Sequence, residues 1–162
     1  MIFVCTGSRN YQFNRLIKAL DDLVADHRIN EEIFAQIGDS TYIPKYFRYA
    51  SFLDAEDFDF YQNMARLIIT HGGTGAIVGA LKKGKYVIGV PRLCKYGEHI
   101  DDHQIQIVEV FERKNFIKAV YDMKDLEETI KFFDFPISIM LNDRESNIVG
   151  IISDFIELCE KG

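Results

Sequence analysis

The sequence predicts an α/β fold in which a parallel sheet is covered by helices on both faces, a doubly wound arrangement. Short apolar runs alternate with segments whose apolar residues recur every three or four positions. The first pattern is typical of buried parallel strands and the second of amphipathic helices. Right-handed crossovers then bring the strands into one sheet. With 162 residues, of which 48% are hydrophobic, one well-filled core and a single domain over residues 1–162 are expected.

The first half of the chain supplies three expected strands and two expected helices. Residues 1–5 form an apolar run that predicts a buried first strand. Residues 13–26 repeat apolar side chains at helical spacing and predict an amphipathic helix. Apolar and aromatic runs at 32–38 and 49–53 predict strands, and residues 57–65 predict a short helix.

The second half begins with a central apolar run at residues 67–70, which predicts a strand. A helix is expected from Thr74 to a C-cap at Gly84, since glycine commonly ends helices. A strand at 85–90 ends at Pro91. The remaining apolar patterns predict a helix at 100–114, a strand at 116–120, a helix at 125–133 and a final helix at about 143–160.

Charge and cysteine content exclude several classes of protein. The net charge is −6 and there is no Lys/Arg stripe, so no nucleic-acid partner is expected. Cys5, Cys94 and Cys159 are odd in number and widely spaced, which indicates reduced thiols in a cytoplasmic protein. No apolar run approaches about 18 residues and no signal-peptide pattern is present, so neither a membrane span nor secretion is expected.

A glycine-rich loop follows the central strand and is the first candidate site. The apolar run ends at Thr70, and the loop His71–Gly75 contains three glycines before the helical pattern begins. Such a loop directs unpaired backbone N–H groups and the positive end of a helix dipole to one point, where a phosphate binds readily. Thr74 is expected to cap the helix or to bond the ligand. A strand–helix connection without a ligand remains the alternative.

Two nucleotide-binding motifs are tested near this loop and rejected. Gly73, Gly75 and Gly79 lack the spacing G-x-G-x-x-G, and the loop is not in the first strand–turn–helix unit, so a nicotinamide cofactor is not expected. Residues 79–86 resemble a P-loop, but Tyr86 replaces the hydroxyl residue that holds magnesium. Their amides also lie at the end of a helix and point away from any such ligand.

The segment from Pro91 to Gln104 carries more polar and titratable residues than a connection requires. In the helix expected at 100–114, Gln104 falls on the buried stripe with Ile100 and Ile107. An amide that points inward needs a hydrogen-bond partner, because burying it unpaired costs about 1–3 kcal/mol. That partner is either a ligand or a nearby backbone group, and the sequence leaves both open.

Three histidines, His71, His99 and His103, are expected to converge at one end of the sheet. A zinc site is rejected because no thiolate or glutamate has the matching spacing. We interpret the imidazoles and Arg92 as hydrogen-bond donors and charge partners of a diphosphate. No cofactor and no metal are expected.

These segments resemble the C-terminal domain of glycosyltransferase family 28. The resemblance rests on Thr70–Gly75, the turn at Gly84–Lys85, the strand end Val90–Arg92 and, most specifically, residues 95–104. Over about residues 1–135 the chain is similar to the small donor-binding subunits of split bacterial exopolysaccharide and capsule glycosyltransferases. Those are related to the catalytic subunit of the two-part lipid-linked N-acetylglucosaminyltransferase of the eukaryotic endoplasmic reticulum.

The resemblance implies a Rossmann-like fold, equivalent to the C-terminal half of a GT-B glycosyltransferase. Such a domain binds the donor UDP-sugar, while a membrane-anchored partner binds a polyprenyl-diphosphate-linked acceptor and supplies the catalytic base. The implied activity is an inverting hexosyl transfer without a metal, in exopolysaccharide or capsule synthesis. The expected location is cytoplasmic, at the inner face of the membrane through the partner.

The resemblance also implies a set of site residues. The Gly72–Gly75 loop is expected to bind the diphosphate, and Gln104 to contact the donor sugar beside Asp102 and His103. Within this chain, His71 and His99 are the candidates for a catalytic group. The full expected set of substrate-binding residues is Gly7, His71, Gly72, Gly73, Thr74, Gly75, Arg92, Glu98, His99, Asp102, His103 and Gln104.

Two positions depart from the family pattern. Gly79 stands where many members have a carboxylate that binds the ribose, and Thr6–Arg9 replaces the usual valine-glycine-threonine loop. The alternative function is a non-catalytic nucleotide-sugar-binding or scaffolding subunit that activates a partner transferase. A nucleotide-binding regulator without sugar chemistry is disfavoured, because it would not need an inward glutamine at position 104.

The C-terminal part of the chain has an excess of apolar residues, in the aromatic run 132–136 and in the final helix at about 143–160. These residues are expected either to join the core or to form a docking element for the missing acceptor half.

Overall fold

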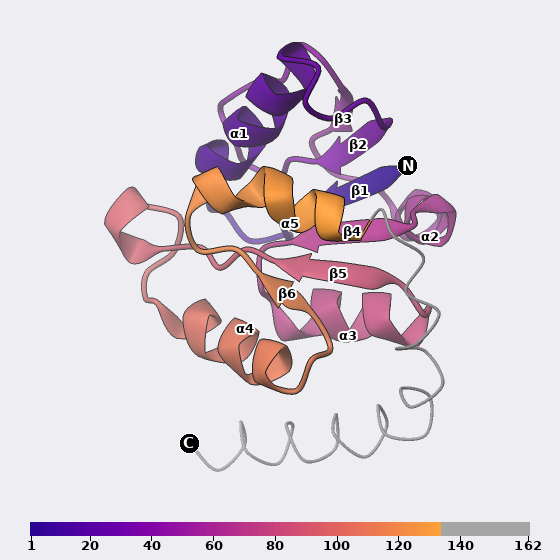
Figure 1. Cartoon of the computed structure of the whole chain (residues 1–162). Helices are drawn as coiled ribbons and strands as arrows, with labels where there is room; N and C mark the ends of the chain where they lie inside the picture. The colour runs from indigo at the N-terminus through magenta and orange to yellow at the C-terminus, as the bar shows by residue number, and fades with distance from the viewer. Residues whose placement is uncertain (134–162) are drawn as a thin grey trace.

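The computed structural model describes residues 1–133, which form a six-stranded parallel sheet with helices on both faces (Figure 1). The strand order is β3-β2-β1-β4-β5-β6. The strands are β1 (Ile2–Cys5), β2 (Ile33–Gln36), β3 (Arg48–Ala50), β4 (Leu67–Thr70), β5 (Tyr86–Gly89) and β6 (Lys118–Ala119). Because the chain runs outward from β1 to β3 and then returns to β4, the topological switch point lies between β1 and β4.

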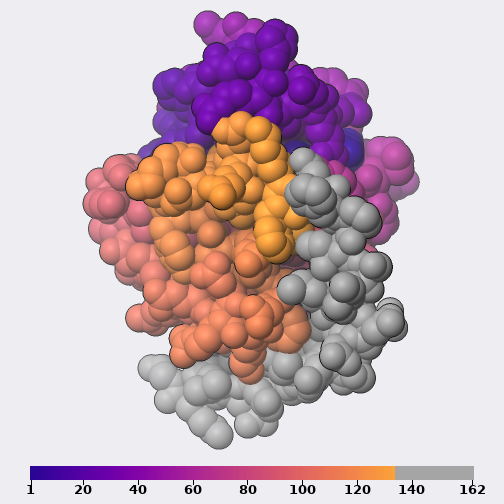
Figure 2. Space-filling view, in the orientation of Figure 1, coloured from indigo at the N-terminus to yellow at the C-terminus, as the bar shows by residue number. Residues whose placement is uncertain are grey.

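Two layers of helices enclose the sheet. On one face, α1 (Asn14–Ala25) and α5 (Leu126–Phe132) lie side by side at the front of Figure 1. The space-filling view in Figure 2 shows the yellow-orange end of the described chain packed against the indigo N-terminal part. The other face is covered by α2 (Ala55–Met64), α3 (Thr74–Lys82) and α4 (His103–Arg113).

Alternation along the strands explains why the sheet needs both layers. In β1, Ile2 and Val4 belong to the core on the α1 and α5 side, while Phe3 and Cys5 belong to the core on the opposite side. All four side chains are at most 1% exposed. A strand buried on both faces reads as a continuous apolar run, which is the pattern that predicted it. The predicted doubly wound, Rossmann-like fold is confirmed.

The helix predicted at 100–114 begins later than expected, and the placement of Ile100 on its buried stripe was wrong. The helix starts at His103, and Ile100 is 70% exposed in the loop before it. A short 3-10 helix, η1 (Cys94–Tyr96), ends at Gly97 in the left-handed conformation (φ 67°). The Asp101 carboxylate then accepts the backbone N–H of His103 and fixes where α4 starts.

Some expectations concern residues that the structure does not describe. The final helix at about 143–160, Cys159 and most of the aromatic run 132–136 lie outside residues 1–133. Within the described range, Cys5 and Cys94 are free thiols. No helix among these residues is long and apolar enough to cross a membrane.

Candidate functional site

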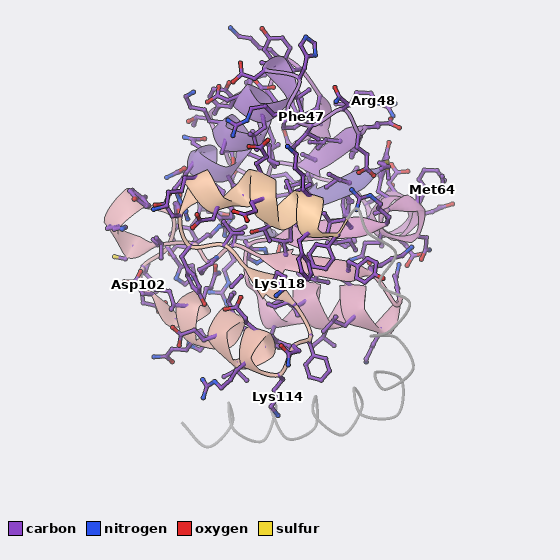
Figure 3. The ribbon with its side chains drawn as sticks, viewed as in Figure 1. Phe47, Arg48, Met64, Asp102, Lys114 and Lys118 are labelled. Carbon is purple, nitrogen blue, oxygen red and sulfur yellow. The ribbon has the colours of Figure 1, made fainter. Side chains whose placement is uncertain are left out.

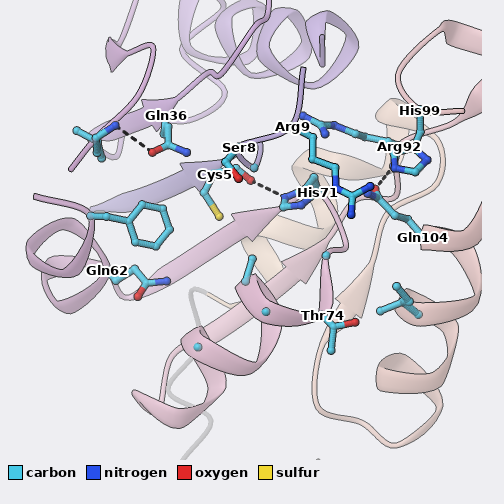
Figure 4. A pocket seen from close by; sticks show the side chains of 18 of the residues that line it. Cys5, Ser8, Arg9, Gln36, Gln62, His71, Thr74, Arg92, His99 and Gln104 are labelled. Carbon is cyan, nitrogen blue, oxygen red and sulfur yellow. Dashed lines mark hydrogen bonds between the residues drawn. The ribbon is translucent and has the colours of Figure 1, made fainter. Parts of the chain in front are cut away.

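A cleft of about 810 Å³ opens where β1 and β4 end (Figure 4). It is lined by the loops that follow β1, β4 and β5 and by helices α2, α3 and α4. Ligands of open α/β sheets bind at the carboxyl ends of the strands beside the switch point. The cleft is therefore in the place that this topology favours for a ligand.

The N-terminus of α3 opens into this cleft. Gly73 is the N-cap with extended backbone (ψ 131°), and within the described chain no side chain caps the helix. Thr74 is the first helical residue, so the prediction that it caps the helix was wrong by one position. Thr74, Gly75 and Ala76 all line the cleft. Unbonded amides of the first turn and the positive helix end thus meet the cleft.

The imidazole of His71 lies between two of the predicted glycines. A Cβ atom at Gly7 would stand 2.7 Å from His71 Nε2, and a Cβ at Gly73 would stand 2.5 Å from it. Both glycines therefore leave room for the ring. Gly72 does not line the cleft: a Cβ there would meet the Val108 side chain at 2.7 Å, so this glycine permits close packing of α4.

Burial keeps His71 neutral at physiological pH. Its pKa is lowered from 6.5 to about 4, mainly by burial and further by the positive charge of Arg92. Nδ1 lies 3.4 Å from the carbonyl oxygen of Cys5 and 3.3 Å from the Thr70 hydroxyl. A bond from Nδ1–H to that carbonyl leaves Nε2 as a hydrogen-bond acceptor in the free protein.

The depressed pKa of His71 predicts a pH dependence of stability. The unfolded chain binds a proton at this residue below about pH 6.5, whereas the native chain does so only below about pH 4. The contribution of His71 to the free energy of unfolding is therefore fully present above pH 6.5, and it falls by about 3 kcal/mol as the pH drops to 4. Urea unfolding from pH 4 to 8 should show a shallower pH slope in His71→Asn than in the wild type.

The exposed His27 provides the matched control for this experiment, since its left-handed backbone (φ 56°) also suits asparagine. The variant His27→Asn should keep the wild-type slope. Equal slopes for His71→Asn and the wild type would contradict the assignment of the pH dependence to His71.

Arg92 places a buried positive charge beside the cleft. Its side chain is 1% exposed, and the guanidinium donates to the carbonyl oxygens of Thr6 and Tyr11, the latter at 3.1 Å. Burial lowers the pKa of Arg92 to about 10, so the group stays charged at neutral pH. Among the described residues Nε has no hydrogen-bond partner. A buried cation of this kind favours an anionic ligand.

Further basic groups surround the same end of the cleft. His99 Nδ1 lies 3.1 Å from Asp101 Oδ1, and the ring packs on Tyr11 with 5.0 Å between centroids. The pKa of Asp101 is below its ordinary value, chiefly because the backbone N–H of His103 donates to it. Arg9 extends toward His71 and Arg92 in Figure 4. Arg9 and Arg92 supply the positive charge of this cationic end, and the imidazoles of His71, His99 and His103 line the same end of the cleft.

Gln104 is buried, as its position on the helical stripe predicted. It is 7% exposed, and Oε1 accepts the backbone N–H of Arg92 at 3.0 Å. The sequence left open whether the partner of Gln104 is a ligand or a backbone group, and for Oε1 the partner is a backbone group. Nε2 forms no hydrogen bond within the described chain, and Gln104 lines the cleft. Its amide N–H groups remain available to a ligand.

Glu98 and Asp102 were expected among the ligand-binding residues, but the structure places neither in the cleft lining. Glu98 is fully buried, with two 2.9 Å bonds from Arg15 and one from the backbone N–H of Leu93. Asp102, labelled in Figure 3 near the start of α4, accepts the backbone N–H of Cys94 at 2.8 Å. Both carboxylates hold the loop between β5 and α4 in shape, Glu98 through both of its oxygens and Asp102 through Oδ1.

The α2 side of the cleft was not foreseen from the sequence. Two glutamines there are each only 5% exposed, Gln36 at the end of β2 and Gln62 on α2. Leu53, Phe58 and Asp59 complete this side. The sequence indicates a special role for Gln36, because it is a polar residue within an apolar strand. It gives no such indication for Gln62, whose helix neighbours are mostly exposed. Only tertiary packing shows that it is buried.

Metal ligands are the remaining candidate groups. Within residues 1–133 no three His, Cys, Asp or Glu side chains are arranged to hold a metal ion. Whether the reaction uses a metal stays a prediction from the sequence.

The sheet order and the helix N-terminus at the switch point define the class of the chain as a Rossmann-like α/β domain. A family model, the glycosyltransferase family 28 C-terminal domain, matches residues 1–147. The chain belongs to this family.

Solved structures agree with this fold. The glycotransferase of kitacinnamycin is similar with a TM-score of 0.62 and 14% sequence identity, over 91% of this chain and 37% of that one. MurG of Acinetobacter baumannii is similar with a TM-score of 0.55 and 18% identity, over 83% of this chain and 41% of that one. The chain thus spans about two fifths of the length of these proteins. No curated protein matches it in sequence.

Proposed function

We propose that this chain is the donor-binding part of a UDP-sugar-dependent inverting glycosyltransferase. The proposal rests on one observation. The α3 N-terminus and the cationic end line the same cleft. Helix amides and fixed cations together form the kind of site that binds a diphosphate without a metal. A cleft of about 810 Å³ also has room for the nucleoside and the sugar.

The same groups suit the chemistry of the transfer. In an inverting displacement, an acceptor hydroxyl attacks the anomeric carbon from the side opposite the diphosphate, and UDP leaves. Negative charge grows on the leaving diphosphate, so donors already aimed at it stabilise the transition state. His71 and His99 line this end of the cleft, and we therefore assign them to the leaving group, with His71 acting as a donor only when its Nε2 takes up a proton. We assign the base that deprotonates the acceptor to a partner.

A partner that binds the acceptor is part of the proposal because the chain resembles the donor-binding subunits of split glycosyltransferases. We infer that a separate, membrane-anchored subunit binds a polyprenyl-diphosphate-linked saccharide and brings this chain to the inner face of the membrane. This arrangement would serve exopolysaccharide or capsule synthesis. The support for it is the resemblance of residues 95–104 to the donor subunits of split enzymes.

Calorimetric titration with UDP, UDP-galactose, UDP-glucose and UDP-N-acetylglucosamine tests the donor site. UDP should bind the wild-type chain, and Thr74→Val should weaken it about five- to tenfold by removing a hydroxyl at the helix N-terminus. Gln104→Ala should abolish the preference for one UDP-sugar while leaving UDP affinity within about threefold, because its free Nε2 is assigned to the sugar.

Two outcomes would contradict parts of this proposal. UDP binding that is the same in the wild type and in Thr74→Val would remove the diphosphate from the α3 N-terminus. UDP-sugar binding without turnover by the chain reconstituted with its partner would favour the alternative, a nucleotide-sugar-binding scaffold.

A further inference from the structure

The α2 side of the cleft holds two glutamine side chains whose surroundings differ. Gln36 Oε1 accepts the backbone N–H of Leu53 at 3.1 Å, which fixes the orientation of its amide. Its Nε2 has no partner among the described residues, and Figure 4 shows the nitrogen turned away from that bond, toward Cys5 and Ser8. Gln36 therefore presents a fixed hydrogen-bond donor to the cleft.

Gln62 is equally buried but is not fixed. Within the described chain its amide makes no hydrogen bond, although the side chain is only 5% exposed and lines the cleft. An amide without a partner can turn either its N–H or its C=O toward a ligand. Among the described residues only Arg92 Nε is a fully enclosed side-chain atom without a hydrogen-bond partner, so the free amide groups of both glutamines open into the cleft and can bond a polar ligand there.

The part of the cleft lined by α3 has room for a flat polar ring. α3 contributes Gly75, Ala76 and Gly79 to the cleft, and a Cβ atom at either glycine would meet no other segment of the described chain within 4 Å. Phe58 adds an aromatic wall from α2. This space continues from the α3 N-terminus, where the proposed diphosphate binds, so its occupant is the nucleoside part of the same donor.

We propose that Gln36 determines which base the site accepts, by donating from its fixed Nε2 to the C4 carbonyl oxygen of the donor's base. Uracil carries a carbonyl at C4, where cytosine carries an amino group, and two facing N–H donors repel each other. Gln36 therefore favours uridine over cytidine nucleotides. Gln62 binds either base because its amide can rotate. This inference rests on the proposed function, since it assumes a nucleoside diphosphate donor.

Titration of the full chain with UDP and with CDP at pH 8 tests the assignment. The wild type should bind UDP at least about tenfold more tightly than CDP, the factor expected for an unmatched buried donor. In Gln36→Glu the carboxylate still accepts the Leu53 N–H but offers an acceptor to the base, so the UDP preference should vanish or reverse. In Gln62→Met both affinities should fall together, with their ratio unchanged.

Thermal melting identifies any variant that fails to fold. If Gln36→Glu does so, Gln36→Met replaces it, because it removes the donor without adding charge and should bring the two affinities within about threefold of each other. Wild-type binding of UDP and CDP with equal affinity, or a UDP preference that survives in the folded Gln36 variant, overturns the inference and leaves the proposed function standing. Failure of the wild type to bind either nucleotide overturns both.

Discussion

Replacement of Glu98 by alanine should lower the free energy of unfolding by about 3–5 kcal/mol. The carboxylate is fully buried, and it receives two hydrogen bonds from Arg15 and one from the Leu93 backbone. Its removal leaves a guanidinium that is only 16% exposed without its anion. Urea or thermal unfolding of the variant measures the loss.

The same substitution should also weaken UDP binding, because Glu98 anchors the loop that carries Arg92 and His99. Glu32→Ala is the control, since Glu32 pairs with Arg48 on the surface, where both side chains are more than half exposed. Such exposed pairs contribute little to stability. A stability for Glu98→Ala that equals that of Glu32→Ala would contradict the anchoring role.

Replacement of Gly75 by alanine should reduce UDP affinity by about 10- to 100-fold without lowering the stability of the chain. Gly75 lies in the first turn of α3 and lines the cleft, and an added Cβ would meet no other segment of residues 1–133 within 4 Å. A methyl group there would collide with a diphosphate bound at the helix N-terminus. Overpacking of this kind costs about 1–3 kcal/mol.

Gly73→Ala gives the contrasting case. There the added Cβ would stand 2.5 Å from His71 Nε2, so this variant should lose stability before any ligand is added. Calorimetry with UDP and thermal melting of both variants separate the two effects. Wild-type UDP affinity in Gly75→Ala would place the diphosphate away from α3.

The order of strands and helices could be predicted from the sequence because each element is encoded by its own apolar periodicity. The continuous apolar residues 1–5 and 67–70 predicted buried strands, and the structure places them side by side at the centre of the sheet. The boundary of α4 could not be predicted in the same way. It depends on a hydrogen bond from the His103 backbone to Asp101 and on the turn at Gly97, while Ile100 fitted the periodicity by coincidence.

Only those parts of the candidate site that depend on local sequence patterns could be predicted from the sequence. The glycine loop and the inward Gln104 are local patterns, and both line the cleft. The roles of the glycines are not local, because Gly73 makes room for His71 and Gly72 for Val108. Glu98 was grouped with the ligand residues by its place in the chain, yet its partner Arg15 lies 83 positions away.

The sequence by itself determined the fold class and the position of the α3 N-terminus, because short-range spacing of apolar residues and glycines encodes both, and the resemblance of particular segments indicated the family. Only the tertiary structure decided which polar side chains line the cleft. Glu98 and Gln36 are both buried polar residues, but the first has every acceptor engaged, whereas the second keeps a donor free. That difference arises from partners brought together by the fold, and no pattern along the chain records it.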